Sequence, residues 1–240
     1  LENLSLLNAS SGNLDILAGQ KPDSNIDILD VSKTPHILIA GTTGSGKTVF
    51  LYSMIVSLIS KHSKDNLEIV IVDPKQTDFH FFKDLPHLRD NKIITDPEEA
   101  LKMLDEINSI EKEHRTQMLI ESNSRDIESY NAKNPSNPMK RLVVFIDEYA
   151  DLVKAAEMLG IRKDFEARLC MLAQRVRNLG IHLVIATQRP SASIVTTALK
   201  ANIPVRISFR LPAHQDSMTI LDRTGAEDLL GKGDMLAMTE

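Results

Sequence analysis

The sequence predicts an α/β fold in which a mostly parallel central sheet is flanked by helices. Short, continuous apolar runs, which are typical of strands buried on both faces, alternate with helical patterns along the chain. The connections between these runs are long enough to hold a crossover helix, as parallel pairing requires. The apolar runs occupy residues 36–40, 67–72, 141–146 and 182–186.

The composition is that of an ordinary globular protein. The chain has 240 residues, of which 42% are hydrophobic and 25% charged, and this length allows one large domain with a sizeable core. A single cysteine excludes a disulfide framework within the chain and a cysteine-based metal site. No apolar run is long enough to span a bilayer, and no signal peptide is visible. Because the chain begins at Leu1 rather than Met, we expect it to be a fragment of a longer protein.

We expect two regions of unequal size. Residues 1–13 are polar and rich in small side chains, without a clear period, and are typical of a tail or linker. Residues 14–18 and 25–31 have the pattern of two short strands around a turn, which predicts a hairpin beside the main sheet. We therefore interpret residues 1–33 as a tail with short strands, a remnant of a preceding small domain, and residues 34–240 as the main domain.

The stretch that organises the main domain is the glycine-rich sequence GTTGSGKT at residues 41–48. It fits the pattern G-x-x-x-x-G-K-[ST] and lies between the strand pattern of residues 36–40 and a helical pattern at residues 49–60. A strand that leads through such a loop into a helix presents backbone N–H groups to an anion. Lys47 is then expected to reach the β- and γ-phosphates of a nucleotide, and Thr48 to offer its hydroxyl to Mg²⁺.

Glycine-rich turns also join strands to helices for reasons of packing alone. The lysine and threonine that end this loop favour a nucleotide site over that alternative. The expected ligands are ATP and Mg²⁺. The predicted nucleotide-binding residues are Gly41, Thr42, Thr43, Gly44, Ser45, Gly46, Lys47 and Thr48.

Two adjacent carboxylates end the apolar run of residues 141–146. The carboxyl ends of strands in an open α/β sheet are where ligands bind, so Asp147 and Glu148 are expected at that edge. Asp147 is predicted to hold Mg²⁺, directly or through water. Glu148 is predicted to act as the general base that polarises the attacking water. The alternative is a strand that simply ends in a polar turn, which the preceding phosphate loop disfavours.

Two further side chains are predicted to act on the γ-phosphate. Gln188 follows the run of residues 182–186, and a polar side chain at the end of a strand between the other two site strands can sense this phosphate. The constellation lacks a cation in cis on the far side of the γ-phosphate. An arginine of a neighbouring subunit would supply it, and of Arg175 and Arg177 the second is the better choice. Such a contact in trans implies a ring of subunits.

The net charge of −5 argues weakly against a nucleic-acid partner, but the charge is unevenly distributed. Residues 161–210 contain nine basic and only two acidic residues. Solvated helix faces explain this excess as well as a surface that faces phosphates, whether of a nucleotide or of DNA. The basic residues are Arg162, Lys163, Arg168, Arg175, Arg177, Arg189, Lys200, Arg206 and Arg210.

Taken together, these residues resemble the FtsK/SpoIIIE family of DNA-translocase motors from about residue 12 to residue 235. The phosphate loop alone would indicate only a superfamily, whereas the whole series of motifs is typical of this family. The matching segments are residues 36–48, 72–75, 86–88, 129–131, 146–152, 180–190, 200–204, 216–217, 219–222, 225–227 and 230–236.

The resemblance implies a RecA-like P-loop NTPase domain of the additional-strand, catalytic-glutamate class. It also implies an ATPase that assembles as a hexamer and pumps double-stranded DNA through its channel. The motor would be cytoplasmic, with membrane contact only through segments absent from this chain. The positions that match the family's Walker A, Walker B, sensor and arginine-finger residues are Lys47, Thr48, Asp147, Glu148, Gln188 and Arg177, in that order.

Several parts of the family's longer members have no counterpart here, namely the membrane part, the linker, most of the small domain and the winged helix that reads DNA orientation. A septal or sporulation role is therefore not implied, and a motor of a mobile element, a phage or a restriction system fits equally well. The alternative function is a coupling ATPase of a conjugation or secretion system that moves protein or a protein–DNA substrate. A third hypothesis is an ATP-binding assembly module without productive hydrolysis, which the intact pair of Asp147 and Glu148 disfavours.

Overall fold

The computed structural model describes residues 2–34 and 36–239, without the side chains of residues 2–4 and 177. Its centre is a six-stranded sheet in the order β4-β5-β6-β3-β7-β8. The first five of these strands run parallel, and β8 pairs antiparallel with β7 at one edge. The strands are β3 (His36–Ala40), β4 (Leu67–Val72), β5 (Arg141–Ile146), β6 (Ile181–Thr187), β7 (Val205–Phe209) and β8 (Met235–Met238). The mostly parallel sheet expected from the apolar runs is confirmed.

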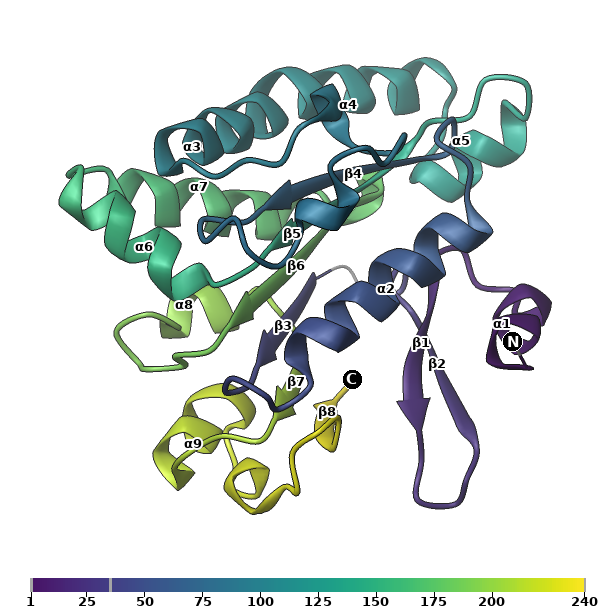
Figure 1. Cartoon of the computed structure of the whole chain (residues 1–240). Helices are drawn as coiled ribbons and strands as arrows, with labels where there is room; N and C mark the ends of the chain where they lie inside the picture. The colour runs from purple at the N-terminus through teal and green to yellow at the C-terminus, as the bar shows by residue number, and fades with distance from the viewer. Residues whose placement is uncertain (1, 35, 240) are drawn as a thin grey trace.

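Helices cover both faces of the sheet (Figure 1). The α-helices of this part are α2 (Lys47–Lys61), α3 (Pro97–Glu106), α4 (Lys112–Glu121), α5 (Ile127–Lys133), α6 (Tyr149–Met158), α7 (Arg162–Arg175), α8 (Thr197–Lys200) and α9 (His214–Leu221). Single turns are formed by η1 (His80–Phe82), η2 (Arg89–Asn91), η4 (Arg177–Leu179) and η5 (Ala226–Asp228), and the π-helix η3 (Ile107–Glu111) joins α3 to α4.

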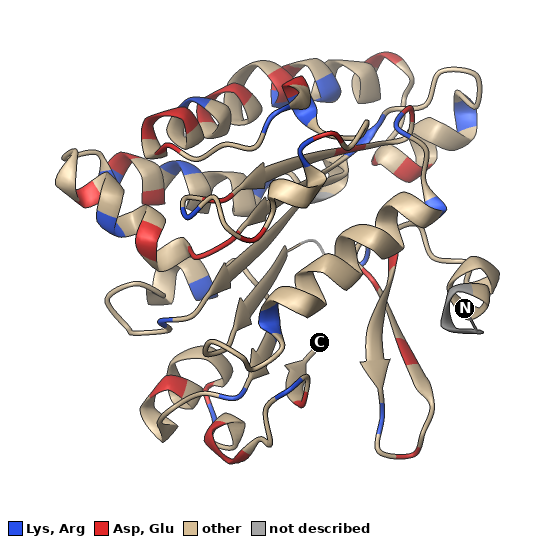
Figure 2. Cartoon of the chain, in the orientation of Figure 1, with Lys and Arg blue, Asp and Glu red and all other residues tan. Residues whose placement is uncertain are grey.

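The sheet separates two apolar cores. Ile37 and Ile39 of β3 belong to the core beneath α2, whereas Leu38 and Ala40 belong to the core beneath α3, α6 and α7. This division follows from the alternation of side chains along a strand. Every residue of β3, β5 and β6 is buried, and the charged residues lie mainly on the outer helices and loops (Figure 2). The central strands therefore form a rigid base for the residues at their ends.

The N-terminal region contains a helix and a separate two-stranded sheet. The expected hairpin is present as β1 (Asp15–Gln20) and β2 (Ile26–Asp30), which pair antiparallel. Where a tail was expected, residues 2–9 form α1 (Glu2–Ala9), because tertiary contacts stabilise a short helix that its own sequence does not. Leu7 is fully buried. Lys61 Nζ lies 2.8 Å from Ser10 O and 2.6 Å from Asp15 Oδ2, which fastens this region to the end of α2.

The main domain also contains elements whose starts or presence need separate mention. Asp96 caps α3, because its Oδ1 atom accepts hydrogen bonds from the backbone of Glu98 and Glu99. Helix α6 and strand β8 are elements that the sequence patterns had not indicated. Helix α8 is four residues long. The division of the chain after residue 33 stays a prediction.

Candidate nucleotide site

The carboxyl ends of three neighbouring strands meet at one edge of the sheet. The glycine-rich loop follows β3, Asp147 and Glu148 follow β5, and Gln188 follows β6. Strand β6 pairs with β3 on one side and with β5 on the other, so it is the additional strand between the two motifs. The parallel register brings residues that are far apart in the sequence to the same edge.

The conformation of the glycine-rich loop depends on its glycines. Gly46 has φ of 108° and immediately precedes α2, a backbone conformation that favours glycine. A Cβ atom on Gly46 would lie 2.6 Å from the backbone nitrogen of Gly233. That nitrogen donates a hydrogen bond of 2.8 Å to Ser45 O. The segment before β8 is therefore packed directly against the loop.

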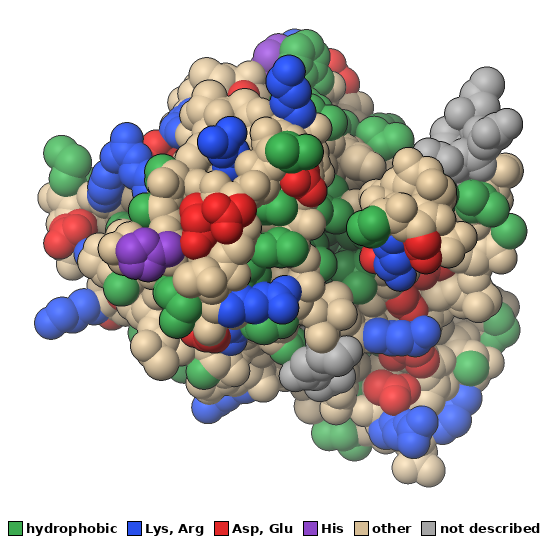
Figure 3. All heavy atoms as spheres, turned by 90° about the horizontal axis from the view of Figure 1, so that it is seen from below, with side chains coloured by type: hydrophobic (Ala, Val, Ile, Leu, Met, Phe, Trp, Pro, Cys, Tyr) green, Lys and Arg blue, Asp and Glu red, His purple; other side chains and the backbone are tan. Residues whose placement is uncertain are grey.

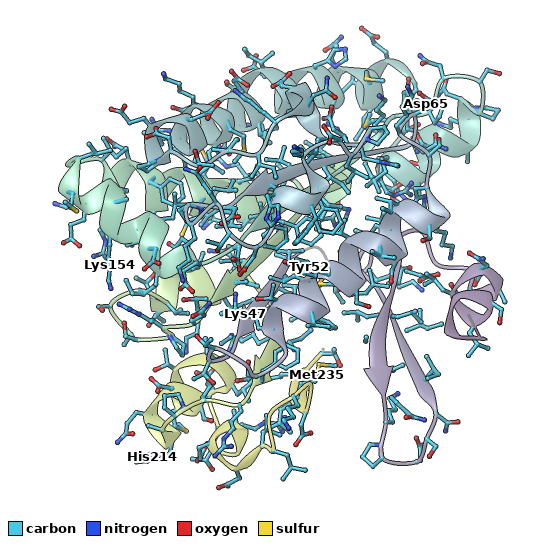
Figure 4. All side chains as sticks on the ribbon, in the orientation of Figure 1. Lys47, Tyr52, Asp65, Lys154, His214 and Met235 are labelled. Carbon is cyan, nitrogen blue, oxygen red and sulfur yellow. The ribbon has the colours of Figure 1, made fainter. Side chains whose placement is uncertain are left out.

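A cavity of about 760 Å³ opens beside this loop. Its walls come from the β1–β2 hairpin, the loop with the first turns of α2, and the segment before β8. Viewed from below, the surface is hollowed and lined by apolar side chains between the hairpin side and the rest of the molecule (Figure 3). Leu17, Ile26 and Met235 line one part of the cavity and Lys47 another (Figure 4). A volume of this size suits a small-molecule ligand.

Lys47 and Asp147 form a buried ion pair. The Nζ atom of Lys47 lies 2.6 Å from Oδ1 of Asp147, and the side chains are 2% and 1% exposed. Burial raises the pKa of Asp147, and the ammonium group of Lys47 opposes this rise. The second carboxylate oxygen, Oδ2, is buried and has no hydrogen-bond partner among the described residues.

The residues around Asp147 fit a magnesium ion. Mg²⁺ prefers oxygen ligands and is usually held by one or two carboxylates, with waters and substrate phosphates completing its shell. The unpartnered Oδ2 of Asp147 is such an oxygen. The hydroxyl of Thr48, in the first turn of α2, is a second.

Glu148 is buried and held on both carboxylate oxygens. It precedes α6 with φ of 51° and is 1% exposed. Oε1 accepts hydrogen bonds from Thr187 Oγ1 at 3.2 Å and from the backbone nitrogen of Gln188 at 3.1 Å. Lys75 Nζ lies 3.3 Å from Oε2. These contacts fix Glu148 beside the end of β6.

Gln188 connects the glycine-rich loop to Glu148. Its side-chain Oε1 accepts a hydrogen bond of 3.0 Å from Thr43 Oγ1, while its backbone nitrogen donates to Glu148. Gln188 is therefore the single residue that bridges Thr43 of the loop and Glu148, the carboxylate that is predicted to activate water.

Arg177 lies apart from this cluster. It begins η4, just before the first residue of β6, whereas Gln188 follows the last residue of that strand. Its backbone therefore lies near the amino end of β6, whereas the glycine-rich loop lies at the carboxyl ends of the parallel strands. The side chain of Arg177 lies outside the part of the chain that the structure describes.

The excess of basic residues at 161–210 is partly neutralised by acidic residues elsewhere. Arg168 pairs with Asp105, and Lys200 and Arg206 share Asp222. Arg162 pairs with acidic residues on either side of it in the sequence. Among the residues that the structure describes, the members of this set without an ion pair are Lys163, Arg175, Arg189 and Arg210.

Sequence reasoning missed three contributors to the site. Lys75 and Thr187 contact Glu148, and the hairpin supplies a wall of the cavity. The signal for Lys75 was its position just after β4, because β4 is the neighbour of β5 in the sheet. Without the strand order, that signal could not be used.

The family model described as "FtsK/SpoIIIE family" matches residues 6–192. The chain belongs to this family. Among curated relatives, DNA translocase FtsK of Helicobacter pylori is 44% identical over 234 residues, which is 96% of this chain and 26% of the relative. DNA translocase FtsK of Caldanaerobacter subterraneus is 45% identical over 223 residues, which is 93% of this chain and 30% of the relative. This FtsK/SpoIIIE domain thus spans less than a third of the length of these relatives.

Solved structures agree with the family. The pCW3 conjugation coupling protein TcpA, in its monomer form with ATPγS, superposes with a TM-score of 0.84 at 32% identity. The match covers 97% of this chain and 64% of TcpA. The type VII secretion ATPase EccC of Thermomonospora curvata superposes with a TM-score of 0.79 at 26% identity, covering 99% of this chain and 29% of EccC. The predicted fold and the predicted class of P-loop ATPase are confirmed. Within the described residues, no helix is long and apolar enough to cross a bilayer.

Proposed function

We propose that this FtsK/SpoIIIE domain is the cytoplasmic motor of a DNA translocase, which hydrolyses ATP to drive double-stranded DNA through a hexameric ring. The observation that carries the proposal is the convergence at one sheet edge of the glycine-rich loop, the Lys47–Asp147 pair and the held carboxylate of Glu148. Phosphoryl transfer needs positioning and charge neutralisation more than covalent chemistry from the protein. These residues can provide both.

The residues act in a defined order. Lys47 leaves Asp147 and turns to the β- and γ-phosphates, while the backbone N–H groups of the loop hold the phosphate oxygens. Asp147 and Thr48 would hold Mg²⁺, which would supply neutralisation of the phosphate charge. Glu148 accepts a proton from the attacking water. Gln188 reports the state of the γ-phosphate to Glu148 through its two contacts.

The position of Arg177 supports assembly into a ring. Its backbone lies at the sheet edge opposite to the loop of its own subunit, so it would complete the site of a neighbour. A closed ring repeats the same heterologous contact between all its members. In such a ring, each nucleotide is held by one subunit and met by the arginine of the next.

Two observations support DNA as the cargo. The curated relatives are named as DNA translocases and match nearly the whole of this chain. In addition, Arg189 is exposed, lacks an ion pair among the described residues and directly follows Gln188. A cation at this position would link phosphate contact in the channel to the γ-phosphate sensor.

A coupling ATPase of a conjugation or secretion system is the second candidate. It is favoured by the superposition on TcpA and EccC, which covers almost the entire chain. Both functions need the same nucleotide site and differ in what the ring moves.

ATP hydrolysis assayed with and without long duplex DNA distinguishes these functions. We expect turnover that duplex DNA stimulates strongly. Stimulation by a protein or peptide substrate, with no response to duplex DNA, would instead identify the coupling ATPase. Absence of turnover under all these conditions would identify an assembly module that binds ATP without hydrolysing it.

A further inference from the structure

Lys75 lies between two carboxylates of the Walker B region. Its Nζ atom is 3.3 Å from Glu148 Oε2 and 3.4 Å from Asp151 Oδ2. The exposed fraction of the side chain is 34% for Lys75 and 33% for Asp151, but only 1% for Glu148. One ammonium group is therefore shared between a buried carboxylate and a partly exposed one.

The contacts of Glu148 restrain its carboxylate from turning to a water in this arrangement. A general base must direct a free lone pair at the water within hydrogen-bond distance. Both oxygens of Glu148 already accept contacts from Thr187, Gln188 and Lys75, and the side chain is closed to solvent. The three donors occupy most of the roughly four lone-pair sites of the carboxylate, and release of one donor would free a lone pair for the water.

Of the three contacts, that of Lys75 comes from the most exposed side chain. Thr187 and Gln188 lie at the end of β6, which is buried along its whole length. The backbone of Lys75 is also fixed, because Asp73 Oδ1 accepts hydrogen bonds from the backbone nitrogens of Lys75 and Gln76. The hydroxyl of Thr187 is fully buried and also accepts a hydrogen bond from the backbone of Arg189, whereas the long side chain of Lys75 is partly exposed and can change partner.

Asp151 offers the alternative partner. It lies three residues after Glu148, in the first turn of α6, and residues with this spacing are neighbours on a helix surface. Because Lys75 already lies within ion-pair distance of Asp151, leaving Glu148 does not leave the ammonium group without a carboxylate.

We propose that Lys75 is a positioning residue that restrains Glu148 in the resting chain, and that Asp151 takes over the ammonium group when Glu148 turns to the attacking water. This inference rests on the proposed ATPase function and adds a restraint on the basal rate. In the resting state Lys75 pairs with Glu148 and keeps it from the attacking water. In the active state Lys75 pairs with Asp151 alone.

The test compares steady-state ATP hydrolysis, without and with duplex DNA, for Lys75→Met, Lys75→Arg and the wild type. Lys75→Met keeps the aliphatic stem and removes the charge. We expect it to raise the basal kcat on the order of threefold, as expected for a partly exposed ion pair, with KM for ATP unchanged and smaller stimulation by DNA. Lys75→Arg should restore the wild-type rate because it keeps the cation. Lys154→Met is the matched control, because Lys154 is an exposed lysine of α6, the helix that carries Asp151 (Figure 4).

Asp151→Asn provides a second variant at a partly exposed position. Without the competing carboxylate, Lys75 stays on Glu148, so the basal kcat should fall while KM for ATP stays unchanged. A basal kcat in Lys75→Met that equals or falls below the wild-type value would overturn the inference, as would an unchanged kcat in Asp151→Asn. Wild-type protein that does not hydrolyse ATP would overturn the proposed function itself, which separates the two failures.

Discussion

Lys47 and Asp147, which are 100 residues apart in the sequence, are joined by a contact of 2.6 Å between Nζ and Oδ1 in a buried site. Each charge compensates the other while no phosphate is bound. Nucleotide binding must therefore exchange one anionic partner of Lys47 for another. A buried charge is costly when it loses its partner. The residues that bind the nucleotide therefore also stabilise the nucleotide-free protein.

Replacing Lys47 with methionine is expected to destabilise the nucleotide-free protein. Asp147 would remain as a buried carboxylate without a cation, at a cost of about 3 kcal/mol. The double variant Lys47→Met/Asp147→Asn should recover part of that loss, because the amide carries no charge. Urea unfolding without nucleotide measures both effects. A single variant as stable as the wild type would contradict the role of the pair. Lys47→Ala, which also lacks the ammonium group, should lose nucleotide binding and turnover as well.

Glu148→Gln is expected to keep nucleotide binding and lose hydrolysis. The amide has the same shape and can still accept the hydrogen bond from the backbone of Gln188, but it cannot take a proton from water. Turnover should fall by about 100-fold or more, the usual contribution of a general base. Titration with a fluorescent ATP analogue is the control for binding. Normal hydrolysis by this variant would show that Glu148 is not the base.

Gln188→Ala tests the link between the loop and Glu148. The substitution removes the hydrogen bond from Thr43 but keeps the backbone contact with Glu148. The loss of one hydrogen bond of about 1 kcal/mol predicts a several-fold lower kcat with KM for ATP unchanged. Gln215→Ala, at an exposed glutamine of α9, is the matched control. A raised KM with an unchanged kcat would assign Gln188 to binding and not to sensing.

Arg177→Ala tests the contact between subunits. Rings of this variant should lose hydrolysis, because no subunit receives an arginine from its neighbour. Mixing it with Glu148→Gln subunits should restore part of the activity, since each mutant supplies the function that the other lacks. The measurement is turnover in mixtures of varied ratio. If mixtures remain as inactive as the separate variants, Arg177 does not act in trans.

Asp30 provides a test of how the hairpin is held. Burial alone would raise the pKa of Asp30, but the hydrogen bonds that its carboxylate accepts from Ser32, Leu14 and Asn13 hold this pKa below its ordinary value. Because the pKa is lower in the folded state, the stabilisation is present above the unfolded value of about 3.9 and is lost as pH falls through the folded value.

Asp30→Asn should therefore lower the free energy of unfolding by about 1 kcal/mol at neutral pH. The difference from the wild type should shrink when the pH falls below about 3.9. Denaturant titrations across this range measure it, with Asp23→Asn at the exposed hairpin turn as a comparison. A difference that does not change with pH would mean that the charge of Asp30 contributes nothing.

The parts of the site that could be predicted are those with local signals. The loop at residues 41–48 combines its own pattern with a strand before and a helix after it. Asp147 and Glu148 could be placed because they end a buried run, and parallel strands align their carboxyl ends. For these residues the short-range pattern and the sheet geometry indicate the same position.

The parts that could not be predicted depend on strand order and on contacts distant in the sequence. Lys75 and Glu148 are 73 residues apart and meet because β4 and β5 are neighbours, which no local pattern reveals. Helix α6 begins directly after Glu148. The backbone of Glu148 lies in the left-handed region and its side chain does not cap the helix, so the start of α6 lacks the usual signal. Helix α1 buries Leu7, and Lys61 holds Ser10 directly after the helix; residues 1–13 alone do not encode these contacts.

The contact between Gly46 and Gly233 changes how variants of the glycine-rich loop should be read. Alanine at Gly46 would meet the backbone of Gly233 before any ligand arrives, in addition to its unfavourable φ. A loss of ATP binding in such a variant would then report displacement of the C-terminal segment as much as loss of phosphate contacts. In this domain the second glycine of the motif is also a folding requirement. A variant at Lys47 leaves the C-terminal segment in place, but it removes the cation that compensates Asp147.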